Sequence, residues 1–174
     1  TTGLMLSVAG LAEFGEINGP VIMPSFTFSA GPHAVAWSNL GVRFVECDPL
    51  SFQIDLAHTS MHLEGAGAIM ATHVFGAPCR PEQVEAMGKS AGIPVLFDAA
   101  HGFGQIDYAV PDLKADFVGI NLHKWIGAPV GMGAIYVRRG RVRDGRVYMP
   151  PFEGTLTQEA IWSIRTYIET RREP

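Results

Sequence analysis

The sequence predicts an α/β fold of three layers, in which helices cover both faces of a mostly parallel wound sheet. Short apolar runs bounded by Gly or Pro recur along the chain, as expected for strands buried on both faces. Stretches with helical periodicity alternate with these runs. The chain has 174 residues, 47% of them hydrophobic, and can bury one sizeable core. We therefore expect a single domain over residues 1–174.

The elements are predicted from periodicity and from breakers. A first helix spans Leu4–Phe14, where Gly10 is the one breaker. In the helix Pro81–Ala91, a proline in the first turn and two glutamates near the start favour a helix N-terminus. Thr155 and Gln158 offer a capping box for a closing helix, in which isoleucines recur at helical spacing. The other helices are expected at Ala30–Leu40 and Asp55–Glu64, and the strands at Pro20–Ser25, Val42–Cys47, Ala68–His73, Pro94–Ala99, Asp116–Leu122 and Met132–Arg138.

Charge and hydropathy argue against nucleic-acid binding and against a membrane span. The net charge is −4, yet residues 138–174 hold 8 Lys/Arg against 5 Asp/Glu. Five arginines lie in the segment 138–146, but no aromatic residues interleave them as single-strand nucleic-acid binding would need, so we interpret the segment as a solvated turn. The segment 17–42 lacks charged residues, but Pro, Gly and Asn interrupt it too often for a membrane span. We expect neither nucleic-acid nor membrane binding.

The cysteine count indicates a cellular location, and the two ends of the sequence suggest that it is part of a longer chain. Cys47 and Cys79 are too few for a disulfide framework, which favours a reducing compartment and predicts a cytoplasmic location. The chain opens on Thr1 without a methionine and stops at Pro174, directly after the predicted closing helix. We therefore expect that it is a processed or incomplete piece.

Two side chains at predicted strand ends point to a cofactor. Asp98 ends one apolar run and Lys124 follows another, so a buried carboxylate and a buried amine are expected at the same sheet edge. Pyridoxal phosphate (PLP) needs a lysine that bonds to its aldehyde and a carboxylate that keeps its ring nitrogen protonated. An ordinary ion pair or a solvated loop end would also account for these two residues.

Further residues fit the same hypothesis, although each has an ordinary structural explanation. Thr1 and Thr2 precede a helix, whose free N–H groups suit a phosphate but are also common in caps. Phe28 could stack on a cofactor ring or belong to the core. His101 follows Asp98 by three residues and could bond that carboxylate or the cofactor's phenolic oxygen.

Metal and dinucleotide sites are weaker hypotheses. The histidines and cysteines that could combine with Asp98 lack the short spacing of structural zinc sites. The run Gly102-Phe103-Gly104 lacks the third glycine of a dinucleotide fingerprint. We expect no bound metal.

Five short runs, in order along residues 1–108, carry a resemblance to a known family. They are Thr1-Thr2-Gly3-Leu4-Met5, Val21-Ile22-Met23-Pro24-Ser25-Phe26-Thr27-Phe28, Phe44-Val45-Glu46-Cys47-Asp48-Pro49, His73-Val74-Phe75-Gly76 and Phe97-Asp98-Ala99-Ala100-His101. Together these runs resemble the DegT/DnrJ family of PLP-dependent sugar aminotransferases. It implies the large domain of the aspartate-aminotransferase-like fold. It also implies a Schiff-base lysine and cofactor contacts at Thr1, Thr2, Phe28, Asp98, His101, His123 and Lys124, with Lys124, Asp98 and His101 as the catalytic residues.

Around Lys124 the resemblance changes. Residues 121–129 and 131–138 look more like class V aminotransferases, the relatives of cysteine desulfurases and isopenicillin N epimerase. The run Glu153-Gly154-Thr155 is similar to a class V loop that reaches the partner's phosphate, which implies a homodimer. Members of both families continue into a small C-terminal domain that supplies an arginine for the substrate carboxylate. That domain is not recognisable here, and nothing singles out Arg165, Arg171 or Arg172 for the role.

Three functions remain open from the sequence. The first is transamination of a nucleotide-sugar or similar keto substrate with an amino-acid donor. The second is class V chemistry, namely desulfuration, lyase activity or epimerisation, with Cys79 as a conceivable persulfide acceptor. The third is a non-catalytic fragment that binds PLP weakly or not at all.

Overall fold

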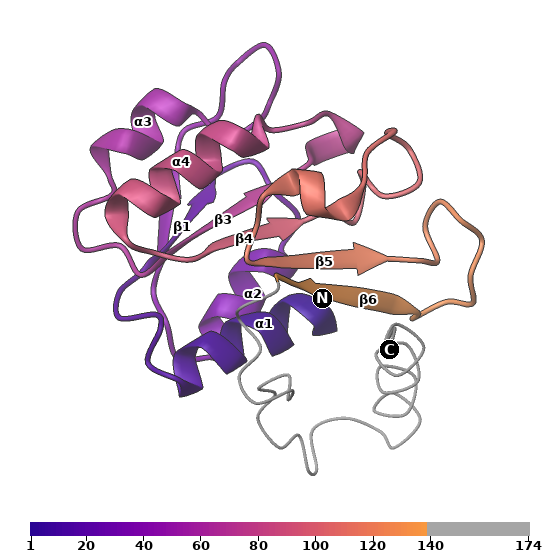
Figure 1. Ribbon diagram of the computed structural model, residues 1–174, viewed down its shortest axis with the longest axis horizontal. Helices are drawn as coiled ribbons and strands as arrows, with labels where there is room; N and C mark the ends of the chain where they lie inside the picture. The colour runs from indigo at the N-terminus through magenta and orange to yellow at the C-terminus, as the bar shows by residue number, and fades with distance from the viewer. Residues whose placement is uncertain (139–174) are drawn as a thin grey trace.

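The computed structural model describes residues 1–138, and within them a six-stranded sheet lies between two layers of helices (Figure 1). The strand order is β2-β1-β3-β4-β5-β6. The strands are β1 (Val21–Pro24), β2 (Val42–Val45), β3 (Ala68–Thr72), β4 (Val95–Asp98), β5 (Phe117–Asn121) and β6 (Gly133–Val137). The helices are α1 (Thr2–Glu13), α2 (Ala30–Trp37), α3 (Leu56–Met61) and α4 (Pro81–Ala91), with 3-10 turns η1 (Val74–Gly76) and η2 (Val110–Leu113).

The direction of the strands decides where a ligand can bind. Strands β1 to β5 are parallel to their neighbours, and β6 runs antiparallel to β5. The carboxyl ends of β1 to β5 therefore share one edge of the sheet, which we call the carboxyl rim. Open parallel sheets bind ligands in the crevice beyond this edge.

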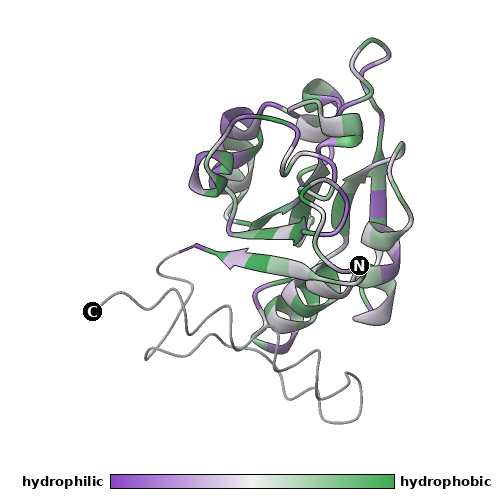
Figure 2. Ribbon diagram, turned by 90° about the vertical axis from the view of Figure 1, so that its right-hand side faces the viewer, coloured by the Kyte–Doolittle hydropathy of each residue, from purple (hydrophilic) through white to green (hydrophobic). Residues whose placement is uncertain are grey.

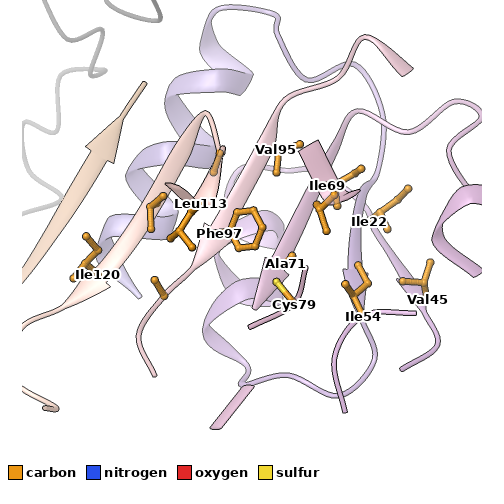
Figure 3. Packing of buried hydrophobic residues seen from close by; sticks show 14 of the residues in the cluster. Ile22, Val45, Ile54, Ile69, Ala71, Cys79, Val95, Phe97, Leu113 and Ile120 are labelled. Atoms are coloured by element: carbon orange, nitrogen blue, oxygen red, sulfur yellow. The ribbon is translucent and has the colours of Figure 1, made fainter. Parts of the chain in front are cut away.

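Two apolar cores, one on each face of the sheet, hold the layers together. Side chains of α1 and α2 pack on one face around Val8, Val35 and Met23. On the other face, Phe97 and Ile69 lie in a second cluster to which Val84 of α4 belongs (Figure 3). In Figure 2 the strands are mostly hydrophobic, and the hydrophilic residues lie mainly on helices and loops. Because both faces are covered, the strands read as continuous apolar runs.

The predicted fold class is confirmed. Each described α-helix and strand overlaps a predicted one, whereas the 3-10 turns η1 and η2 have no predicted counterpart. The strands are one or two residues shorter than predicted. The closing helix predicted after Thr155 lies outside the described residues, as do Arg165, Arg171, Arg172 and the run 153–155. Within residues 1–138, no helix has the length and apolar character needed to cross a bilayer.

A glycine of β5 lets α1 reach the carboxyl rim. A Cβ at Gly119 would lie 2.8 Å from Cδ2 of Leu4, so a larger residue there would push the first turn of α1 away from the sheet. Gly119 pairs with Asp98, the last residue of β4. The N-terminal turn of α1 is thus packed at the level where the parallel strands end.

Candidate functional site

Asp98 provides the carboxylate of the candidate site. It is the last residue of β4 and lies between Thr72 of β3 and Gly119 of β5 in the sheet register. Its side chain is 6% exposed, and its Oδ1 accepts a hydrogen bond of 3.0 Å from the N–H of Ala100. The predicted buried carboxylate is therefore present, and within the described residues its second oxygen is left for a ligand.

Lys124 lies in the loop after β5 and is exposed, so the prediction of a buried amine is wrong. The strand ends at Asn121, and the chain then turns outward above the carboxyl rim. The ammonium Nζ of Lys124 lies 5.9 Å from the centroid of the Phe28 ring, within the range of a cation–π contact. Phe28 is itself exposed, which contradicts the alternative that it is a core residue.

His101 connects the carboxylate and the amine electrostatically. Partial burial lowers the pKa of its imidazole first, the Lys124 ammonium lowers it further, and the Asp98 carboxylate raises it. These charges act on His101 only if both side chains lie within electrostatic range of it. Lys124 contacts the ring of Phe28, and both Lys124 and Asp98 influence His101, so the four residues at or after the ends of β1, β4 and β5 lie on one part of the carboxyl rim.

The hydrogen bonds of His101 fix its tautomer. Its Nδ1 accepts a bond of 3.3 Å from the N–H of Phe75, and Gln105 donates to its carbonyl oxygen. An Nδ1 that accepts a bond carries no proton, so the neutral imidazole holds its proton on Nε2. Among the described residues no hydrogen bond joins His101 to Asp98, and such a bond was one of the two roles considered for His101. His101 is instead oriented as a hydrogen-bond donor through Nε2.

The other predicted cofactor contacts lie at the same rim or beside it. Thr1 caps α1 without a side-chain hydrogen bond, and both Thr1 and Thr2 are exposed. Their hydroxyls and the free N–H groups of the first turn are thus open to an anion. His123 is half-buried, and its Nδ1 donates to the carbonyl oxygen of Met132. That bond ties His123 to the base of the loop that follows Lys124.

The side chains considered for a metal are dispersed. Within residues 1–138, no three His, Cys, Asp or Glu side chains are close enough to hold a metal ion. Cys79 is buried, and burial raises the pKa of its thiol. Arg138, the first of the five clustered arginines, pairs with Glu85 of α4, and the other four lie outside the described residues.

His73 is a buried histidine behind the candidate site, and it predicts a pH dependence of stability. Burial lowers the pKa of its imidazole below the usual value of about 6.5. Below that pH, His73 binds a proton in the unfolded chain but stays neutral in the folded chain. The free energy of unfolding therefore falls on acidification. The expected slope is up to about 1.4 kcal/mol per pH unit. Urea unfolding between pH 5 and 8 (roughly this window) measures it.

His73→Gln provides the matched comparison. The variant loses a titrating group but keeps a side chain that can accept the N–H of Cys79, which now bonds to Nδ1 of His73. Its free energy of unfolding should fall less steeply with acidification than that of the wild type. Parallel curves for the two proteins would contradict the assignment of the pH dependence to His73.

Several residues of the site are not predicted by the sequence pattern. Phe75 binds His101 through its main-chain N–H although its φ is 54°. The hydroxyls of Thr27 and Thr72 lie 3.1 Å apart and join the loop after β1 to the end of β3. The run Phe75-Gly76 directly after an apolar strand is a weak signal of a tight turn. No local pattern indicates which distant side chains such a turn contacts.

Proteins similar to this chain include a sugar transaminase and a probable cysteine desulfurase. A model of the DegT/DnrJ/EryC1/StrS aminotransferase family matches residues 1–109. The chain is 32% identical over 90 residues to dTDP-4-amino-4,6-dideoxy-D-glucose transaminase of Escherichia coli, which covers 51% of this chain and 24% of that protein. It is 31% identical over 125 residues to a probable cysteine desulfurase of Pyrococcus abyssi, covering 70% of this chain and 30% of that protein.

Two solved structures resemble the chain in fold and in part of its sequence. DesI, determined in the presence of its TDP-sugar product, aligns with a TM-score of 0.60 and 30% identity over 69% of this chain and 31% of that chain. NtdA of Bacillus subtilis, determined with bound cofactor PMP, aligns with a TM-score of 0.59 and 25% identity over 68% of this chain and 27% of that chain. The chain thus spans about a quarter to a third of the length of these relatives.

Proposed function

Because the chain belongs to the DegT/DnrJ/EryC1/StrS aminotransferase family, we propose that it transfers an amino group from an amino-acid donor to the keto group of a nucleotide sugar or a similar substrate. Pyridoxal phosphate is the cofactor of this family. The observation that carries the proposal is the position of Asp98, Lys124 and Phe28 at or after the ends of strands of the carboxyl rim, with Nζ of Lys124 5.9 Å from the centroid of the Phe28 ring.

The residues at the rim fit this cofactor by their chemistry. Asp98 offers a carboxylate oxygen that the Ala100 N–H does not occupy. Lys124 offers a solvent-accessible primary amine, and Phe28 an exposed aromatic face beside it. A carboxylate, an amine and an aromatic ring are what a pyridinium nitrogen, an aldehyde and a planar ring require.

Each residue has a distinct role in the proposed reaction. PLP, when bound, supplies an electron sink for the negative charge that develops at the substrate's α-carbon. Lys124 would hold the cofactor through its aldehyde and would carry the proton during amino transfer. Asp98 would keep a proton on the ring nitrogen, and Phe28 would stack on the ring. His101 would donate from Nε2 to the phenolic oxygen, and the first turn of α1 with Thr1 and Thr2 would bind the phosphate.

A second function, class V chemistry, is favoured by the similarity to a probable cysteine desulfurase. The conceivable persulfide acceptor does not support it, because Cys79 is buried and a thiol with a raised pKa is a poor nucleophile. Amino-acid screening separates the two functions. Amino transfer to a keto sugar supports the first, whereas release of sulfide and alanine from cysteine supports the second.

The test of the proposal is a titration of the 174-residue chain with PLP, followed by visible absorbance. Covalent attachment to a lysine gives a band in the near-violet region that free PLP in the same buffer does not match. Addition of an amino-acid donor should bleach this band, and addition of a keto acceptor should restore it. A wild-type chain without the band would support the third function, a fragment that does not bind the cofactor.

The assembly and location of the chain remain predictions. We propose a homodimer with a single domain over residues 1–174, in the cytoplasm. Sedimentation of the chain with and without PLP measures whether it forms a homodimer.

A further inference from the structure

Three phenylalanines from separate loops meet at the carboxyl rim beside the candidate site. Phe26 follows β1, Phe52 follows β2, and Phe75 lies in η1 after β3. The ring centroid of Phe26 is 5.6 Å from that of Phe52 and 5.9 Å from that of Phe75. The three residues are 45%, 48% and 70% exposed, respectively. We call them the aromatic triad.

The loops that carry the triad are built to hold these rings outward. Phe52 and Phe75 have φ values of 58° and 54°, a left-handed conformation that bulky residues rarely adopt. The buried amide of Gln53 joins their loops, because its Nε2 donates to the carbonyl oxygens of Ser51 and Val74 at 3.1 and 3.2 Å. Strained residues that the surroundings hold in place cluster at ligand sites. The exposure of the rings is therefore a property of an ordered surface.

The triad is continuous with the candidate site. The Phe75 ring lies nearly parallel to the His101 ring, with an interplanar angle of 8° and centroids 6.4 Å apart. His101 in turn lies within electrostatic range of Asp98 and Lys124. The triad therefore adjoins the candidate site through the Phe75 and His101 rings.

We propose that the aromatic triad is the subsite for the nucleobase of a nucleoside diphosphate sugar. This inference rests on the proposed function and names the part of the substrate that the triad recognises. The three rings are about half exposed or more, so aromatic surface is accessible to a planar base. Because every base has a π-face, stacking tolerates both purines and pyrimidines.

The test measures nucleotide binding to the PLP-treated 174-residue chain by isothermal titration calorimetry. The probes are dTDP, GDP and inorganic pyrophosphate. Both nucleotides should bind, and pyrophosphate should bind at least about tenfold more weakly, because it lacks the base. Phe75→Ala should weaken dTDP binding roughly 5- to 100-fold, the range for loss of one stacking partner. Phe75→Tyr, which keeps the ring, should stay within about threefold of the wild type.

Trp37→Ala is the matched control, because Trp37 is 73% exposed and ends α2, outside the triad. Its dTDP affinity should equal that of the wild type. Phe75→Gly removes the same ring and relieves the positive φ, so it replaces Phe75→Ala if the latter does not fold. Thermal unfolding checks each variant.

The possible outcomes distinguish a failure of the nucleobase subsite from a failure of the proposed amino transfer. Unchanged dTDP affinity in Phe75→Ala and Phe52→Ala, or equal affinities for dTDP and pyrophosphate, would overturn the subsite. Dissociation of a wild-type dimer by Phe75→Ala would assign the triad to a second copy and overturn it as well. A chain that shows the PLP band but binds no nucleotide refutes the subsite alone. Nucleotide binding that depends on Phe75 in a chain without the band supports the subsite and refutes transamination.

Discussion

Asp98→Asn is expected to retain cofactor uptake and to lose most turnover, by roughly 10²- to 10³-fold. An amide of the same shape can still accept the N–H of Ala100, so the end of β4 should keep its geometry. A neutral amide cannot, however, hold a proton on the ring nitrogen by charge. The visible PLP band should persist, while the rate at which an amino-acid donor bleaches it should fall.

Asp107→Asn is a suitable control, because Asp107 is an exposed carboxylate on a loop after β4. Its donor half-reaction should proceed at the wild-type rate. If Asp98→Asn also reacted at nearly that rate, the buried carboxylate would have no part in the chemistry. Its burial would then be explained by the sheet register and the Ala100 hydrogen bond alone.

The sheet and the position of Asp98 follow from features that are local in the sequence. Uninterrupted apolar runs identify strands covered on both faces, and parallel strands must deliver their next residues to one edge. This reasoning places Asp98, His101 and Lys124 together without any knowledge of contacts. It also singles out Asp98 among the polar residues, because burying a carboxylate at the end of an apolar strand costs free energy unless the carboxylate has a partner.

The surroundings of these residues do not follow from local pattern. Phe75 reaches His101 because its backbone has a positive φ, which no propensity favours for phenylalanine. The buried Gln53 joins two loops by hydrogen bonds to main-chain carbonyls, and these partners are set by tertiary packing. The exposure of Lys124 was missed for a related reason. The sequence indicates where β5 ends but not whether the chain then turns outward.

Lys124→Ala is expected to abolish the visible band of the PLP-treated chain and to lower turnover by about 10²- to 10⁴-fold. The amine is exposed and lies beside Phe28, so its removal should change the free energy of unfolding by no more than about 0.5 kcal/mol. Absorbance spectra and urea unfolding of the same preparation measure both effects. A loss of the band in a stable protein would then be due to the missing amine.

Two further lysine variants separate covalent attachment from charge. Lys89→Ala removes an exposed lysine of α4 that pairs with Glu85, and its band should match the wild type. Lys124→Arg keeps a positive charge near Phe28, yet a guanidinium stays protonated and cannot bond to the aldehyde. If Lys124 acted only through its charge, Lys124→Arg would retain the band and most of the turnover. We expect it to behave like Lys124→Ala, because the reaction needs a nucleophilic amine at this position.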